Sequence, residues 1–184
     1  MVCLLPVVTM TKPQLVLETG RLRLRPRTVD DLVANLAMDL DPEVQRYIFA
    51  APPGPEAWRA HTLARITSGW PPVGGIWVVE WQGEPGFLGW CGLFPLENSG
   101  LIEIGYRYVR AAWGQGVATE AARAVLDHGF RVLAIDPVVA VAHPDNSGSH
   151  GVLRKIGLRP SGEAWHYGKW LPFYRLTRVE YLAS

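Results

Sequence analysis

Two glycines in the middle of the chain could present backbone amides to an anion. Gly114 and Gly116 lie between a strand-like run rich in Ile, Tyr and Val and a segment whose apolar residues repeat at helical spacing. Glycine permits a tight turn with exposed N–H groups, and a helix that begins there adds unpaired first-turn amides and the positive end of its dipole. The pattern therefore predicts an anion site of the kind that phosphates occupy.

The same stretch lacks two common phosphate-binding signatures. No Lys-Ser or Lys-Thr follows the glycines, which argues against a nucleoside triphosphate loop, and no G-x-G-x-x-G marks a dinucleotide-binding fold. Glycine is also the default residue of sharp turns, so a plain strand-to-helix connection is the alternative interpretation of these residues taken by themselves.

A single carboxylate stands out in the strand that precedes the glycines. Glu103 interrupts the apolar run 101–109, and strand alternation places it on one face with Leu101, Gly105 and Arg107. Its carboxyl could serve as a general base, or it could be a structural group paired with Arg107 or with an arginine of the first strand. Burial would raise its pKa and a nearby arginine would lower it, so both interpretations stay open.

The composition restricts the class of protein. With 184 residues, 48% of them hydrophobic, the chain can bury one substantial core, which predicts a single domain over residues 15–184 after a flexible tail over residues 1–14. A net charge of +1 argues against a nucleic-acid binder. The alternating arginines of the first strand are expected to form a solvated face of that strand: Arg21, Arg23, Arg25 and Arg27.

The cysteines and apolar runs indicate a cytoplasmic protein without a membrane segment. Cys3 and Cys91 are too few for a disulfide framework, which favours a reducing compartment. Cys91 is interpreted as a buried thiol instead of a nucleophile, because no local base pattern activates it. Residues 1–8 lack a basic region and are interrupted by Pro6, so no signal peptide is predicted, and no metal is expected.

Periodicity and turn residues predict the secondary structure. Helices are expected over 29–40, 42–48, 56–67, 117–130 and from Asn146 onward, and strands over 15–25, 75–81, 87–96, 101–109, 137–142, 158–168 and 173–182. Early strands, then strand–helix–strand–helix and closing strands, predict an α/β fold with a sheet of mixed direction and helices on both faces.

Two ordered blocks are similar to a known family. The stretch Trp113-Gly114-Gln115-Gly116-Val117-Ala118-Thr119-Glu120-Ala121 resembles the pyrophosphate-binding loop and helix of the GNAT superfamily of acyl-CoA-dependent N-acetyltransferases, most of all the Rim-type branch with its ribosomal-protein N-terminal acetyltransferases. The blocks 143–149 and 152–158 resemble the N-x-x-S helix of that family, and 17–26 and 103–106 extend the similarity. Trp113 and Leu158 depart from the usual pattern, yet neither removes a backbone donor.

The resemblance implies a mostly antiparallel central sheet in which two parallel strands, here 101–109 and 137–142, splay apart and admit acetyl-CoA. Backbone amides near Tyr108 and Val109 would polarise the thioester carbonyl, and the glycine loop would bind the pyrophosphate. The residues expected to bind the cosubstrate are Tyr108, Val109, Trp113, Gly114, Gln115, Gly116, Val117, Ala118, Thr119, Asn146 and Ser149.

The resemblance also implies acetyl transfer to a primary amine by direct attack on the thioester, with a small molecule or a protein N-terminus as acceptor. Glu103 is the candidate base. Many family members carry a tyrosine acid in the Asn-led helix, but this chain has none between Asn146 and Gly157, so Ser149 is the candidate acid and protonation by solvent is its rival. Asn146 and Ser149 could instead serve mainly as a helix cap.

Acceptor specificity is expected from residues that flank the splay, although packing explains most of the tryptophans. The candidates are Trp58, His61, Trp70, Tyr167 and Trp170. Two other classes remain alternatives: a non-catalytic acyl-CoA-binding or sensor domain, and a dimeric interaction module that pairs through its terminal strand. The chain is expected to be a monomer or a homodimer that binds neither nucleic acid nor membrane.

Overall fold

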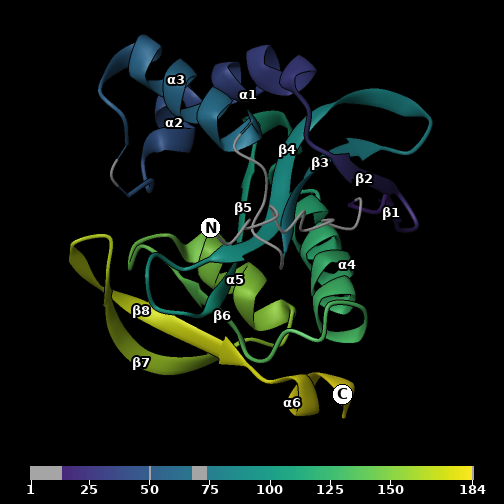
Figure 1. Ribbon diagram of the computed structural model, residues 1–184, viewed down its shortest axis with the longest axis vertical. Helices are drawn as coiled ribbons and strands as arrows, with labels where there is room; N and C mark the ends of the chain where they lie inside the picture. The colour runs from purple at the N-terminus through teal and green to yellow at the C-terminus, as the bar shows by residue number, and fades with distance from the viewer. Residues whose placement is uncertain (1–13, 50, 68–73, 184) are drawn as a thin grey trace, which may run out of the picture.

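A computed structural model describes residues 14–49, 51–67 and 74–183. Its strands form one eight-stranded sheet in the order β1-β2-β3-β4-β5-β6-β8-β7 (Figure 1). The strands are β1 Leu17–Glu18, β2 Leu22–Pro26, β3 Gly75–Trp81, β4 Glu84–Pro95, β5 Ile102–Tyr108, β6 Val138–Val141, β7 Arg159–His166 and β8 Lys169–Leu176. The expected α/β fold is confirmed.

Most neighbouring strands in the sheet are antiparallel. The exception is β5 with β6, whose parallel pairing covers only Ile102 opposite Val138 and Glu103 opposite Val139. Beyond these residues β5 continues beside β4, whereas β6 pairs with β8. The two parallel strands therefore separate toward their carboxyl ends, as the sequence resemblance implied.

Helices cover both faces of the sheet. They are α1 Leu32–Asp39, α2 Pro42–Gln45, α3 Gly54–Thr67, α4 Val117–Arg131, α5 Ser147–Lys155 and α6 Arg178–Leu182, with 3-10 turns at Val29–Asp31 and Arg110–Ala112. Figure 1 shows α1 to α3 gathered at one end, and α4 and α5 beside the middle strands. No helix of the described segments is both long and apolar enough to cross a bilayer.

Two apolar clusters mark the two faces. The larger one joins α4 to the sheet and includes Ile104 and Tyr108 of β5. The smaller one lies under α1 and α2 and includes Met38, Trp90 and Phe94. Alternate residues of β5 thus face different layers, because successive strand side chains point to opposite sides of the sheet.

The arginine stripe forms the expected solvated face only in part, since Arg21 and Arg23 are exposed whereas Arg25 and Arg27 are half-buried. Arg25 binds both Asp31, at 2.7 Å, and Glu80, at 3.1 Å, and Arg23 binds Glu80 at 2.9 Å. Glu80 is only 3% exposed, so it holds these guanidinium groups against the sheet. The prediction did not include these ion pairs, because strand alternation shows which face a side chain shares but not which carboxylates lie on the neighbouring strand.

Two predicted element boundaries were wrong. The segment 15–25 is divided into β1 and β2 by a turn, in which the Thr19 amide donates to the carbonyl of Leu22 at 2.9 Å. The predicted last strand ends at Leu176, and residues 178–182 form α6, because Thr177 and Glu180 make a capping box. The predicted tail lies outside the described residues except Gln14, whose side-chain amide donates to the carbonyl of Ile76 at 3.0 Å.

Candidate active site

The glycine loop places backbone amides ahead of α4. Gly114 and Gly116 have φ angles of 72° and 79°, in the left-handed region that favours glycine, and Gly116 caps the helix. The first hydrogen bond of α4 runs from the amide of Glu120 to the carbonyl of Gly116 at 3.0 Å. The amides of residues 117–119 therefore have no hydrogen-bond partner within the helix. They form the positive end of the helix dipole, where an anion is stabilised.

Arg21 holds the loop and the first turn of α4 together. Its guanidinium binds the carboxylate of Glu120 at 2.6 Å and donates to the carbonyl of Gln115 at 3.1 Å. The hydroxyl of Thr19 donates to the other carboxylate oxygen at 2.6 Å. A carboxylate beside a phosphate site would repel the phosphate, so the positive charge of Arg21 both fixes the loop and offsets the charge of Glu120.

The remaining side chains of the loop have separate roles. The indole N–H of Trp113 donates to the carbonyl of Tyr108 at 2.9 Å, and the side-chain amide of Gln115 donates to the carbonyl of Ala111. The main-chain amide of Trp113 also stays within the protein, because it donates to the carbonyl of Arg110 at 3.0 Å. Trp113 and Gln115 therefore shape the bend between β5 and α4 from within.

The backbone at the end of β5 has one amide directed into the splay. The amide of Val109 donates to the carbonyl of Leu88 at 2.9 Å, so it is not available to a thioester carbonyl, which corrects one of the two expected donors. Bonded and non-bonded pairs alternate along an antiparallel ladder, and Tyr108 is opposite Gly89 in the next, non-bonded pair. The amide of Tyr108 therefore points away from β4, toward the gap.

Glu103 lies where the splay begins. It is 7% exposed, and its Oε1 accepts a hydrogen bond from the hydroxyl of Tyr167 at 3.1 Å. Burial is the main influence and raises the pKa of Glu103 to about 7, although Tyr167 and the charge of Arg65 act in the opposite direction. A carboxyl with this pKa can accept a proton near neutral pH and return it to solvent.

The structure does not pair Glu103 with Arg107 or with an arginine of the first strand, which was the alternative interpretation. The guanidinium of Arg107 binds Asp39 on α1 at 2.5 Å, and Arg23 and Arg25 of β2 bind Glu80 and Asp31. Within the described part of the chain, no ion pair includes Glu103. Its raised pKa is the physical consequence of burial without a paired cation.

Ser149 lies on the other side of β5 from Glu103. Its amide donates to the side-chain oxygen of Asn146 at 3.0 Å, which confirms Asn146 as the helix cap. Its Oγ lies 3.1 Å from the hydroxyl of Tyr106, a β5 residue on the α4 face. Burial raises the pKa of Tyr106, so its phenol keeps its proton.

The structure divides the predicted acceptor residues into two groups. Trp58 is buried, its ring lies 5.9 Å from that of His61 and 5.5 Å from the guanidinium carbon of Arg107, and these residues share a layer with Glu103. Trp170 is 64% exposed and packs edge-on against Trp165 at 5.9 Å, away from the carboxyl. Trp70 lies outside the described residues.

Sequence reasoning named Tyr167 but missed the side chains that stack beside it, those of Tyr47, Phe49 and His143. An aromatic wall formed by Tyr47, Phe49, His143 and Tyr167 stands beside the carboxyl. The ring of Phe49 stacks on Tyr167 at 5.6 Å and on His143 at 6.1 Å, and Tyr47 lies 5.2 Å from His143. No local spacing could have indicated this wall, because its members come from segments far apart in the chain.

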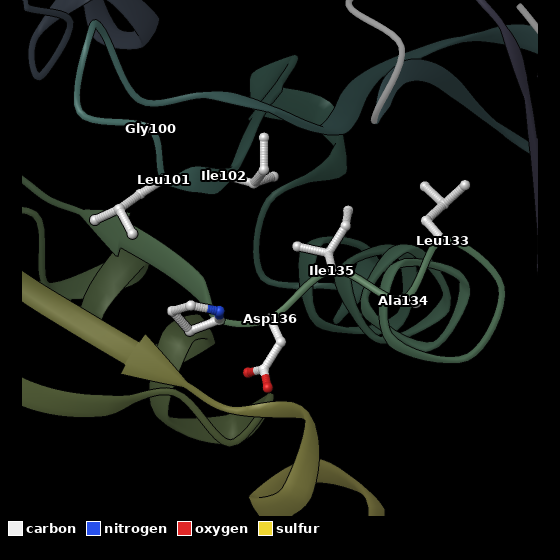
Figure 2. Close-up of a pocket in the computed structure, with 8 residues that line it drawn as sticks. Gly100, Leu101, Ile102, Leu133, Ala134, Ile135 and Asp136 are labelled. Atoms are coloured by element: carbon white, nitrogen blue, oxygen red, sulfur yellow. The ribbon is translucent and has the colours of Figure 1, made fainter.

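The hollow drawn in Figure 2 lies away from these groups. Leu101, Ile102, Ile135 and Asp136 line it at the amino ends of β5 and β6, opposite the splay. Cys91 is fully buried and burial raises the pKa of its thiol to about 12, which agrees with a structural role. The described residues include no group of three or more His, Cys, Asp or Glu side chains arranged to hold a metal ion.

Comparisons with known proteins agree with this geometry. The family description "Acetyltransferase (GNAT) domain" matches residues 21–159. The chain is 41% identical over 96 residues to the uncharacterized protein YkkB of Bacillus subtilis, covering 51% of this chain and 52% of YkkB. It is 32% identical over 157 residues to an FsC-acetyl coenzyme A-N(2)-transacetylase of Aspergillus fumigatus, covering 80% of this chain and 66% of that protein. These matches span between half and two thirds of each relative.

Solved structures share the fold at lower identity. An acetyltransferase of the GNAT family from Bacillus anthracis superposes with a TM-score of 0.76 at 24% identity, covering 90% of this chain and all of the other. RimJ of Mycobacterium smegmatis, solved with a CoA disulfide, superposes at 0.69 with 21% identity, covering 86% and 83%. At these identities the likeness shows the fold alone.

Proposed function

This chain belongs to the GNAT acetyltransferase family, and from that premise we propose that it transfers an acetyl group from acetyl-CoA to a primary amine. The observation that carries the proposal is the position of Glu103, a buried carboxyl with a pKa of about 7 at the point where β5 and β6 part. The N(2)-transacetylase name of the Aspergillus relative supports a nitrogen atom as the acceptor.

The residues present fit acetyl-CoA. The left-handed glycines leave space where side chains would stand, and the amides from Gly114 to Thr119 form a donor set for a pyrophosphate. The proposed contacts of the cosubstrate are these loop residues, the Tyr108 amide, and Asn146 and Ser149 at the start of α5. Val109 contributes backbone shape, since its amide is already engaged.

The proposed mechanism uses groups on both faces of β5. Acetyl-CoA supplies the acetyl group as a thioester. Glu103 accepts the proton of the attacking amine at its carboxylate, directly or through water, and the Tyr108 amide faces the gap where a carbonyl oxygen would be polarised. Ser149, with the hydroxyl of Tyr106 3.1 Å from its Oγ, donates a proton to the departing sulfur.

The arrangement of these groups supports a single-step transfer. Glu103 belongs to the layer of α1 and α3, whereas Ser149 belongs to α5 on the opposite layer. A base on one face and an acid on the other suit an amine that enters from the first and a sulfur that leaves toward the second. Cys91 is buried and its thiol has a raised pKa, so it does not suit the role of a nucleophile that would form a covalent acetyl-enzyme.

The proposal is tested by thiol release from acetyl-CoA with a panel of primary amines, including peptides that begin with Ser, Ala or Thr. Release that depends on the amine, with an acetylated product found by mass spectrometry, supports the transferase. Turnover of the peptides would support the Rim-type branch. Normal acetyl-CoA binding by calorimetry with no release for any amine would instead favour the acyl-CoA-binding or sensor alternative.

A further inference from the structure

Arg65 places a guanidinium on the face of the sheet that carries Glu103. Its Cζ lies 5.3 Å from the centroid of the Phe94 ring. Phe94 is directly opposite Glu103 in the β4–β5 register, and directly opposed residues of an antiparallel pair share a face with Cβ atoms about 5 Å apart. The Phe94 ring also fills the space above Gly105, where an added Cβ would meet its Cζ at 2.6 Å. The guanidinium of Arg65 therefore lies over Phe94, the residue directly opposite Glu103 on the neighbouring strand.

The other arginines of this layer have partners within the protein. Arg107 binds Asp39, whose other oxygen accepts from Asn35 at 2.6 Å. Arg27 donates to Asn35 at 3.2 Å and to the main-chain carbonyl of Arg65 at 3.3 Å. These contacts fix the helix end that carries Arg65 while leaving its own guanidinium out of the network.

The guanidinium of Arg65 has no carboxylate of its own. No ion pair within 4 Å includes it among the described residues. The residues outside the described ranges contain no Asp or Glu side chain that could supply one. Burial is the main influence that lowers the pKa of Arg65, and the like charge of Arg107 lowers it further. A partly buried cation without a counter-ion costs free energy, which a bound anion would recover.

The charges of the layer favour one class of amine. Its guanidinium groups are those of Arg27, Arg65 and Arg107, and its carboxyls are those of Asp39 and Glu103, of which Glu103 is only partly ionised near neutral pH. The charge of Glu97 also reaches Glu103, but this carboxylate is already engaged by His166 at 2.9 Å and by the amide of Tyr167 at 3.1 Å. A polyamine would add positive charge to an existing excess. An amine that carries a carboxylate would place its nitrogen at Glu103 and its anion on Arg65, a residue whose planar fork suits carboxylate oxygens.

We propose that the acceptor is an amino-acid-like primary amine and that Arg65 binds its carboxylate. This inference rests on the proposed function, because it names the substrate class of the same site. The aromatic wall of Tyr47, Phe49, His143 and Tyr167 reaches Glu103 through the hydroxyl of Tyr167, and its stacked rings would receive an apolar or aromatic side chain of the acceptor.

The test compares amino acids with the amines that remain when their carboxylate is removed. The pairs are phenylalanine with phenethylamine, tyrosine with tyramine, histidine with histamine and leucine with isopentylamine. Thiol release is measured at equal concentrations of the free amine, so that the amine pKa does not enter. At least one pair should show a kcat/KM ratio of roughly 10 to 100 in favour of the carboxylate, the range expected for a charge-assisted hydrogen bond.

Variants on α3 show whether Arg65 causes the ratio. Arg65→Gln should bring the ratio close to one, mainly through KM of the amino acid, and Arg65→Lys should restore part of it because the charge is kept. Arg59→Gln is the matched control, since it removes the same charge from an exposed position of the same helix and should leave the ratio unchanged. Thermal melts verify that each variant is folded.

The possible failures of the two proposals are distinct. Turnover of several amines with no preference for the carboxylate in any pair, or a preference that survives Arg65→Gln, would overturn the inference and leave the transferase intact. If no amine releases thiol, the proposed function fails. Calorimetry of phenylalanine against phenethylamine on the CoA-loaded protein then still decides whether Arg65 binds a carboxylate, because tighter binding of phenylalanine must be lost in Arg65→Gln.

Discussion

The hydroxyl of Tyr167 on the β7–β8 turn donates to the carboxylate of Glu103 on β5 at 3.1 Å. Tyr167 has a φ of 52°, and its amide donates to Glu97 at 3.1 Å, a carboxylate that also binds His166 at 2.9 Å. The turn is therefore held so that the phenol reaches the candidate base. This contact links the hairpin at one edge of the sheet to the reacting centre between β5 and β6.

Glu103→Gln should remove the rise of activity with pH. A base must be deprotonated, so kcat/KM of the parent, corrected for the free amine, should increase as pH passes through about 7, the pKa of Glu103. The variant should be slower by roughly 100-fold, within the usual range for loss of a general base, and its profile should be flat there. Initial rates between pH 5.5 and 9 measure both effects. Equal profiles for the two proteins would eliminate Glu103 as the base.

Tyr167→Phe should shift the rise of kcat/KM with pH, which Glu103 is expected to cause, to higher pH. The phenol stabilises the charged carboxylate and so lowers the pKa of Glu103. Without the phenol, desolvation raises the pKa of Glu103 further. The variant should approach parent turnover only at alkaline pH. Tyr47→Phe is a matched control, because it removes a hydroxyl from the same aromatic wall without touching Glu103. A shift to lower pH in Tyr167→Phe would contradict this account.

Stability should also depend on the charge of Glu103. The folded pKa lies above its ordinary value of 4.5, so the cost of the buried carboxylate is absent below that value and is fully present above about pH 7. Glu103→Gln should therefore gain stability relative to the parent as pH rises from 5 to 8, by on the order of 3 kcal/mol at most. Urea unfolding at both pH values measures the difference. A constant difference would mean that Glu103 titrates normally.

Gly116→Ala should weaken acetyl-CoA binding without unfolding the protein. The φ of Gly116 is 79°, which strains any residue that carries a side chain. A Cβ added there would lie 3.4 Å from a guanidinium nitrogen of Arg21, inside the loop that is proposed to bind the pyrophosphate. Gly83→Ala is the control, with a φ of 76° in an open turn. Both changes should cost about 1–2 kcal/mol of stability, but only Gly116→Ala should lower CoA affinity in calorimetry. Equal affinities would refute the loop assignment.

Tyr106→Phe and Ser149→Ala should act on one proton pathway. The two hydroxyls lie 3.1 Å apart, so each single change should reduce kcat by about 10-fold or more, and the double variant should lose less than the product of the two. Acetyl-CoA affinity by calorimetry separates this effect from binding. If kcat is unchanged in both single variants, solvent protonates the leaving sulfur.

Local sequence patterns were sufficient for parts of this site. The glycines predict the bend before α4, the types of Asn146 and Ser149 indicate a helix cap as one of two alternatives, and the strand predicted over 75–81 has the bounds of β3. Each of these depends on residues within a few positions of one another. The alternation of β5 also placed Glu103 and Arg107 on one face. These features follow from the backbone preferences of glycine, from capping chemistry and from the two-residue period of strands.

The partners of those residues could not be predicted in the same way. Arg107 and Asp39 are 68 positions apart, and Tyr106 and Ser149 are 43 apart. The sequence left open whether Glu103 pairs with an arginine, and in the structure Arg107 binds Asp39 instead. The Asn-led helix has no tyrosine between Asn146 and Gly157, but the hydroxyl of Tyr106 reaches Ser149 from β5. Such contacts depend on strand order and on how the helices pack.

By itself the sequence determined the α/β class, the glycine bend before α4 and the position of Glu103 as a lone carboxylate in an apolar strand, because short-range periodicity and residue chemistry encode them. Only the tertiary structure decided that Glu103 is buried without an ion pair to any described residue, that Tyr167 reaches it, and that Arg65 lies on the same face of the sheet. Burial and charge pairing are properties of what other elements bring close, and those elements are joined to β5 only through the folded sheet.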